Sequence, residues 1–447
     1  MNAPIKFPLP LATFEEYMLA DDRPAHPMQF FCRLWFAGAI DRHRFMGAAS
    51  EAINRHRLLN ATVARIGRCW CWVPSDKVEP ELNWFATEPL DTMPAARWID
   101  LESSPGLRIT VRQGQSRADV VFHFHHACCD GTGAMQYIHD LLVLYSNANQ
   151  HEARKVTLDA LDEQKLLSRE TFGLSRWDRL KLTRKQLVGV AGIRQFFSRS
   201  PQPLVPHEVE PDQSELPPAY PTVLVHEFDQ QQTTSIKQRA MEIGVSMNDL
   251  LVGSLFLAIT SWRSENRLGD ERDWLRMSVP VSMRQFGSES IPAANFVSMI
   301  FLDRRGLDCE QPEELVRGIR DEMDLIKRNQ LGFTFPLTLQ AFKLLTGGVK
   351  RAINAKTCSA SGLVTNVGTI LARSPLPRHE GKLMINGLLL DRVEIGAPNR
   401  PYQCVAFSLL IYGGRLALCT QYDSRVLDKA QASGLLGAYV ERLLGNL

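Results

Sequence analysis

The sequence predicts an α/β or α+β protein made of two lobes of similar size. Segments with the pattern of strands and segments with the pattern of helices are mixed through both halves of the chain. A proline-rich segment separates the halves, and a length of 447 residues favours two or three domains.

In the first half, apolar runs predict strands and apolar residues at helical spacing predict helices. The predicted strands are 30–36, 69–73, 107–111 and 119–126. The predicted helices are 14–19, 40–57 and 133–145. The helix 40–57 has Phe45, Ala48, Ala49 and Ile53 on one side and charged residues on the other, so we expect it to cover a sheet.

Seven prolines lie between Pro201 and Pro221. Each fixes its own φ, removes a hydrogen-bond donor and disfavours helix at the residue before it. We therefore expect an extended linker at 201–221 that crosses between the lobes. It divides the chain into an N-terminal lobe, 1–200, and a C-terminal lobe, 222–447.

The second half shows the same mixture of patterns. The predicted strands are 223–228, 275–281, 296–302, 406–412 and 416–422, the last two joined by a Gly-Gly hairpin signal. The predicted helices are 230–244, 246–263, 313–328 and 427–444. Asn248 and Asp249 fall in the first turn of helix 246–263, where free backbone N–H groups favour such side chains.

Composition excludes several classes of function. Lys and Arg total 51, Asp and Glu total 49, and the formal net charge is +2, so nucleic acid is not an expected partner. The nine cysteines suggest neither a disulfide framework nor a paired metal site. The first residues lack a signal-peptide pattern and no run of 18 apolar residues occurs. We expect a cytoplasmic protein.

The segment 120–131 carries the pattern H-H-x-x-x-D-G at the end of a predicted strand. Side chains alternate along a strand, so His125 and His126 point to opposite faces and one of them can face a cleft. A neutral imidazole can take a proton from an alcohol, amine or thiol and return it to a leaving group. Asp130 can orient the imidazole or pair with a distant cation, and Gly131 permits a tight turn.

Other interpretations of this segment are simpler or chemically different. His123 shares a face with His125, and both fit a packing role. His123, His125 and Asp130 could also bind zinc, but no further ligands stand at a recognisable spacing, so we expect no metal. Cys128 or Cys129 could act as a nucleophile beside His126, although adjacent cysteines are more often buried.

Further segments carry a family pattern, and they follow one another in order along the chain. They are the segment 8–14, which begins P-L and ends in Phe14, then V-S-M-N-D-L-L at 245–251, V-P-V-S-M-R at 279–284, N-F-V-S at 295–298 and T-N-V-G at 365–368. With H-H-x-x-x-D-G they make the chain resemble the condensation-domain-like, CoA-dependent acyltransferase superfamily. In pattern it is nearest to bacterial wax ester synthase/diacylglycerol acyltransferases and to polyketide-associated acyltransferases.

The resemblance implies two chloramphenicol-acetyltransferase-like lobes in a V with a channel between them. It implies that His126 is the catalytic base, and that Asp130 is structural and pairs with Arg284. His125 and Gly131 would support the active site structurally. Asn248, Asp249, Asn295 and Asn366 would shape the channel and the lobe interface. The sequence departs from the family pattern at two positions. Gly133 and Pro10 each stand where the family usually has Ser.

Three functions follow as hypotheses. The first is an acyltransferase that moves an acyl group from a CoA or carrier thioester to a hydrophobic alcohol, with no bound cofactor. The second is a free-standing condensation enzyme that forms an amide from an acyl-carrier-protein donor. The third is a non-catalytic relative that binds a ligand in the channel, which the intact His126 and Asp130 disfavour.

Two segments suggest peripheral contact with a membrane. Residues 176–199 contain seven basic residues and one acidic residue interleaved with apolar ones. The apolar stretch 333–353 is flanked by Lys327, Arg328, Lys350 and Arg351. A lobe-connecting helix and a core segment explain the same two patterns without a membrane.

Overall fold

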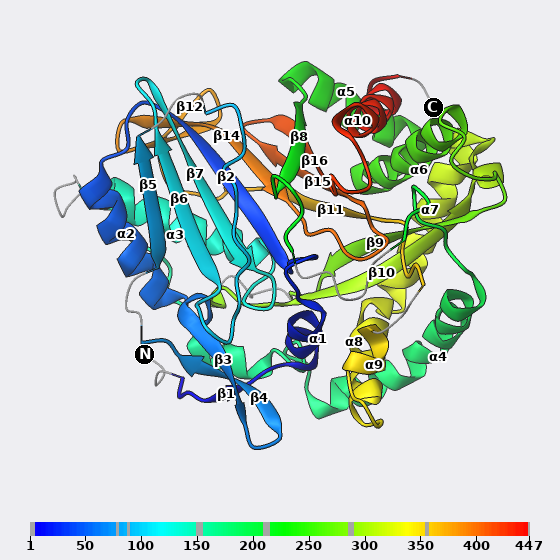
Figure 1. Cartoon of the computed structure of the whole chain (residues 1–447), viewed down its shortest axis with the longest axis horizontal. Helices are drawn as coiled ribbons and strands as arrows, with labels where there is room; N and C mark the ends of the chain where they lie inside the picture. The colour runs from blue at the N-terminus through cyan, green and yellow to red at the C-terminus, as the bar shows by residue number, and fades with distance from the viewer. Residues whose placement is uncertain are drawn as a thin grey trace.

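The computed structural model describes residues 5–76, 80–86, 90–148, 155–208, 215–284, 290–353 and 357–445. Two large β-sheets, each covered by helices, form two lobes (Figure 1), and they contact each other through β14 of the first sheet and β15 and β16 of the second. A third, small sheet lies beside the first lobe. The structure confirms the predicted mixed architecture with two lobes.

The first sheet has seven strands. In spatial order they are β12 (Arg378–His379), β13 (Lys382–Ile385), β14 (Leu388–Gly396), β2 (Gln29–Ala37), β7 (Arg117–His125), β6 (Leu107–Gln113) and β5 (Glu81–Ala86). Strands β2 and β7 are antiparallel, with Gln29 opposite His125. Helices α2 (Arg42–Arg55) and α3 (Gly131–Asn147) pack against each other behind this sheet (Figure 1).

The second sheet has six strands. In spatial order they are β10 (Val297–Arg305), β9 (Trp274–Ser282), β11 (Gly362–Thr369), β15 (Val405–Tyr412), β16 (Arg415–Tyr422) and β8 (Thr222–Glu227). It is covered by α5 (Gln230–Ile243), α6 (Met247–Glu265), α7 (Pro312–Arg328) and α10 (Lys429–Leu444) (Figure 1). Helix α6 packs against α7 and α10 and is buried along most of its length, which explains its apolar sequence.

The remaining elements surround the junction of the lobes. The small sheet consists of β1 (Leu9–Pro10), β4 (Cys69–Pro74) and β3 (Ala61–Ile66). Four helices lie near its edge and along the second lobe: α1 (Thr13–Asp21), α4 (Arg176–Ser198), α8 (Thr334–Lys343) and α9 (Lys350–Ile353). Short 3-10 helices are η1 (Arg57–Asn60), η3 (Glu163–Ser168), η5 (Gly306–Cys309) and η6 (Leu331–Phe333).

Strands from late in the sequence complete the first sheet. β14 pairs with β2 through most of its length, with Ile395 opposite Cys32, and it also contacts β15 and β16 of the second sheet. The division of the chain into an N-terminal lobe (1–200), a linker (201–221) and a C-terminal lobe (222–447) stays a prediction. The topology adds that 378–396, from the second range, belongs to the sheet of the first lobe. This exchange of strands joins the lobes through backbone hydrogen bonds.

Each helix and strand predicted from the sequence is present, with ends shifted by a few residues. The strand predicted to end at His126 ends at His125, and His126 begins the turn. The sequence reading did not mark the strands β3, β5, β11 and β12–β14. No single helix among the described residues is both long and apolar enough to cross a bilayer, although α5 and α6, bent by 96°, meet that test as a pair.

Candidate active site

His126 lies at the junction of the two lobes, and its backbone is held from both sides. Its N–H donates to the carbonyl of Met28 at 2.7 Å, in the first lobe. Its carbonyl accepts from the Asn295 side-chain amide at 2.8 Å, just before β10 of the second lobe. The imidazole packs against Phe30, with ring centroids 5.0 Å apart. Main-chain contacts therefore fix the residue and leave its ring to face the cavity.

A cavity of about 1800 Å³ lies between the lobes. His126 and Thr132 line it from the first lobe, and Asn366 lines it from β11 of the second. A volume of this size holds a substrate larger than most drug-like ligands. The structure thus brings the second histidine of the motif to a large cavity, from the turn that follows β7.

The His126 ring is suited to act as a base. Burial lowers its pKa below the ordinary value of 6.5, while contact with its own backbone and the charge of Asp130 act in the opposite direction. The ring is therefore neutral at pH 7. A neutral imidazole beside a cavity can accept a proton from a substrate.

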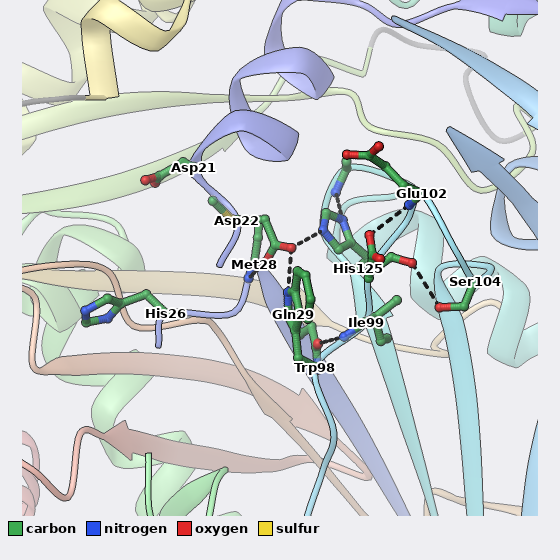
Figure 2. A network of polar contacts seen from close by, with 12 residues as sticks. Asp21, Asp22, His26, Met28, Gln29, Trp98, Ile99, Glu102, Ser104 and His125 are labelled. Carbon is green, nitrogen blue, oxygen red and sulfur yellow. Dashed lines mark hydrogen bonds and ion pairs between the residues drawn. The ribbon is translucent and has the colours of Figure 1, made fainter. Parts of the chain in front are cut away.

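His125 is not among the residues that line the cavity, and its side chain lies in a buried polar network (Figure 2). Its Nδ1 accepts from the Ala127 N–H at 3.2 Å, so in the neutral ring Nε2 carries the proton and faces Asp22 at 3.4 Å. Asp22 also accepts from the Trp98 indole at 2.7 Å and from the Met28 N–H at 2.6 Å. Burial raises the pKa of Asp22, but these hydrogen bonds outweigh it and the pKa is lowered.

The Asp22 network also supports His126. Met28 donates its N–H to Asp22 and accepts the His126 N–H with its carbonyl, so one residue links the two. Arg400, from after β14, donates to the Asp21 carboxylate at 2.9 Å and to the His26 carbonyl at 2.6 Å. The loop between Asp21 and Met28 is therefore anchored at several points, and it positions the backbone of both motif histidines.

Asp130 links the motif to the second lobe. Its carboxylate accepts from Arg284 at 2.9 Å and from the Phe296 N–H at 2.8 Å. It also caps α3 by accepting from the Gly133 N–H at 2.7 Å. The ion pair that the resemblance implies is thus present, and both side chains are largely buried. This set of donors holds the aspartate as a structural anion.

Gly133 explains one departure from the family pattern. A Cβ at this position would lie 3.0 Å and 3.1 Å from the backbone N and O of Ala294. The missing side chain lets α3 approach the segment before β10 closely. Gly131 begins α3 and lines the cavity, where a Cβ would meet only ordinary contacts.

The four residues expected at the lobe interface have different positions. Asn295 bridges to His126 as described, and Asn366 lines the cavity. Asn248 accepts from the Asn366 amide at 3.4 Å. Asp249 instead accepts from the backbone and hydroxyl of Ser246 and completes the capping box of α6, so its position follows from helix capping.

The alternative chemistries have little structural support. Cys128 and Cys129 are fully buried, and burial raises the pKa of both thiols well above 9.0, so neither is a thiolate at neutral pH. Within the described residues no group of three or more His, Cys, Asp or Glu side chains is arranged to bind a metal. His123 is buried against Phe31, where burial lowers its pKa to about 4.

Sequence reasoning missed Asp22, Met28 and Arg400. The signal for Asp22 was weak: two aspartates before prolines at 21–27 indicate an ordered turn. Met28 acts through its backbone, which no side-chain pattern reveals. Arg400 is distant in sequence from the residues that it contacts.

Comparison with known proteins concerns the fold. No protein-family model matches the chain. Two uncharacterized proteins from strains of Mycobacterium tuberculosis are 24% identical over 357 residues, which is 77% of this chain and 78% of each protein.

Solved structures match over nearly the whole chain. The epimerization domain of tyrocidine synthetase B, third module, aligns with 14% identity and a TM-score of 0.67, over 100% of this chain and 98% of that domain. The first condensation domain of the CDA synthetase aligns with 14% identity and a TM-score of 0.70, over 99% of this chain and 96% of that chain. The trichothecene 15-O-acetyltransferase TRI3 of Fusarium sporotrichioides aligns with 12% identity and a TM-score of 0.66, over 98% of this chain and 95% of that chain.

The chain therefore has the two-lobed fold of these condensation and epimerization domains and of this O-acetyltransferase.

We predict that His126→Ala lowers kcat of a base-catalysed reaction in this cavity by about 10²–10⁴-fold, the usual contribution of general-base catalysis. His125→Ala should act through stability instead, because it leaves the buried Asp22 without one donor, at a cost of about 1–3 kcal/mol. Thermal melting and turnover of both variants separate these effects. A folded His126→Ala variant with near-wild-type turnover would exclude His126 as the base.

The wild-type pH profile provides a second check of His126. Because the base must be neutral and its pKa is lowered, kcat/KM should be constant at pH 7 and above and should fall at acidic pH through a pKa below 6.5. An acidic limb well above 6.5 would contradict this assignment.

We predict that Asp130→Ala destabilises the protein by roughly 3–5 kcal/mol, because Arg284 would remain buried without its partner. Asp130→Asn should cost less, since the amide oxygen can still cap α3. Chemical denaturation of both variants measures the difference. If Asp130→Ala unfolds at the wild-type denaturant concentration, the ion pair does not hold the lobes together.

Proposed function

We propose that this protein is an acyltransferase that moves an acyl group from a CoA or carrier-protein thioester to a hydrophobic alcohol. The observation that carries the proposal is the neutral His126 ring at the cavity between the lobes. The imidazole takes the proton from the alcohol as its oxygen attacks the thioester carbonyl. The carbon–sulfur bond then breaks, and the leaving thiolate receives that proton from the imidazolium.

An aromatic wall of the cavity supports an apolar substrate. We call the side chains of Phe14, Phe335, Phe301 and Phe196 the aromatic wall. They form a chain of ring contacts: Phe14 to Phe335 at 5.7 Å, Phe335 to Phe301 at 5.8 Å, and Phe301 to Phe196 at 4.9 Å. All four line the cavity. Such a wall favours a hydrocarbon chain, from the acyl donor or the acceptor, over a charged acceptor.

The structural neighbours support acyl transfer without deciding the acceptor. One is named as an O-acetyltransferase, and others are condensation domains of peptide synthetases. The amide-forming condensation enzyme therefore remains the alternative outcome. Carrier-protein recognition is compatible with both.

Peripheral contact with a membrane stays a prediction. In α4, Val190 and Phe197 are exposed, and in and after α8 so are Leu337, Leu344 and Leu345. This exposed region reaches the cavity, because Phe197 lines the cavity together with Phe335 of the aromatic wall. These features are compatible with an apolar substrate that arrives from a lipid surface.

A thiol-release assay tests the proposed function. We expect purified protein to release free thiol from acyl-CoA in the presence of long-chain alcohols, and His126→Ala to abolish the release. The panel pairs each alcohol with the amine of equal chain length and adds an acyl-carrier-protein donor. A preference for amines and for the carrier donor would replace the proposal with the condensation alternative.

We predict that Gly192→Leu shortens the longest chain that is accepted. Gly192 lies in α4, lines the cavity, and a Cβ there meets no atom within 4 Å, so a leucine has room to occupy substrate space. Each buried CH₂ of a chain contributes about 0.8 kcal/mol, so excluding two or more of them should lower kcat/KM for long chains by about tenfold or more relative to short chains.

Gly318→Leu is the matched control, since Gly318 is an exposed glycine of α7 with equally open space that does not line the cavity. Both changes replace a helical glycine with a better helix former, so both variants should fold. Equal chain-length profiles in the two variants would contradict the prediction.

A further inference from the structure

A second wall of the cavity is polar. Tyr402 and His207 face each other with ring centroids 5.7 Å apart, and both line the cavity. The next residue, Gln403, donates from Nε2 to the Ser278 hydroxyl on β9 at 3.5 Å. We call Ser278, Gln403, Tyr402 and His207 the polar wall.

The hydrogen bonds fix which way the Gln403 amide points. Ser278 donates its single hydroxyl proton to the Gly362 carbonyl at 3.1 Å. Toward Gln403 the hydroxyl oxygen can therefore act only as an acceptor, which places the amide nitrogen of Gln403 against it. The amide oxygen, Oε1, must face elsewhere.

Gln403 Oε1 is a buried acceptor that receives no hydrogen bond from the described residues. The residue is 6% exposed and lines the cavity. Oε1 itself is enclosed in the structure, so a donor in the cavity reaches it when the side chain turns toward the cavity. Leaving such an oxygen unsatisfied costs about 1–3 kcal/mol, so an N–H or O–H donor that reaches it would bind favourably.

We propose that Gln403 Oε1 accepts a hydrogen bond from an amide N–H in the pantetheine arm of the thioester substrate. This inference rests on the proposed function, because it takes a CoA or carrier thioester as the donor. The pantetheine arm contains two amide N–H groups along a flexible chain. The aromatic wall is built from side chains without acceptors, whereas the polar wall offers this oxygen.

The position of the polar wall fits an arm that enters from solvent. Gln202 and Pro206 line the cavity and are exposed, so the cavity reaches the surface beside His207. The Ser361 hydroxyl donates to the Gln202 carbonyl and accepts from the Arg276 N–H at 3.0 Å, which ties this rim to β9. An arm threaded here would pass Tyr402 and His207 before it reaches Gln403.

The experiment combines one protein variant with one changed ligand. Gln403→Met keeps the side-chain length and removes the acceptor. The ligands are a non-hydrolysable acyl-pantetheine thioether and its analogues in which one amide N–H or the other is replaced by an ester oxygen. Binding is measured by calorimetry, which does not depend on turnover.

We expect wild type to bind one ester analogue about three- to tenfold more weakly than the amide, the usual effect of one hydrogen bond. Gln403→Met should bind that analogue and the amide equally, as a double-mutant cycle requires. With acyl-CoA, the variant should show a raised KM for the thioester and an unchanged kcat.

The control is Gln421→Met, which changes another buried glutamine, on β16, that does not line the cavity. It should leave the discrimination between amide and ester intact. If Gln403→Met instead raises the KM for the acceptor alone, Gln403 binds the acceptor hydroxyl and the inference is wrong. If wild type does not discriminate between the ligands, Oε1 binds no amide and the inference is also wrong. If no thioester is turned over or bound at all, the proposed function itself fails.

Discussion

The carboxylate of Asp130 is the point at which the two lobes are joined beside the active site. It accepts from Gly133 within its own turn and from Arg284 and the Phe296 N–H of the second lobe. One side chain thus sets both the start of α3 and the position of the segment before β10. Because Asn295 in that segment holds the His126 carbonyl, the site depends on the same junction. Removing a partner from a buried ion pair is costly, so the arrangement is strongly determined.

The same burial that stabilises the junction prepares the base. It lowers the pKa of His126 and raises the pKa of Cys128 and Cys129, so one turn contains a neutral imidazole and two protonated thiols. Both effects have one physical cause, the penalty for charge in a poorly solvated site. Burial alone thus leaves the imidazole of His126 neutral at the cavity and keeps both neighbouring thiols protonated.

The sequence predicted the fold class and most elements, because hydrophobic periodicity encodes them locally. The family resemblance of the H-H-x-x-x-D-G and V-P-V-S-M-R segments implied the cavity-facing histidine and the Asp130–Arg284 pair. It did not predict that β14 joins the first sheet, since strand pairing over more than 350 residues leaves no local trace. It placed Asp249 at the lobe interface, whereas helix capping explains the same residue. It missed Asp22 and Met28 because their roles depend on backbone hydrogen bonds and on a turn.

The two walls of the cavity meet at Arg276, and this contact relates the basic and apolar sequence of 176–199 to the cavity. The guanidinium lies 4.1 Å from the centre of the Phe196 ring, donates to the Phe196 carbonyl at 3.0 Å, and pairs with Asp303 at 2.6 Å. A buried, neutralised cation thus fixes the end of α4 to the second sheet. Since Phe196 belongs to the aromatic wall and Arg276 lies two residues before Ser278 of the polar wall, a movement of α4 would change both walls together.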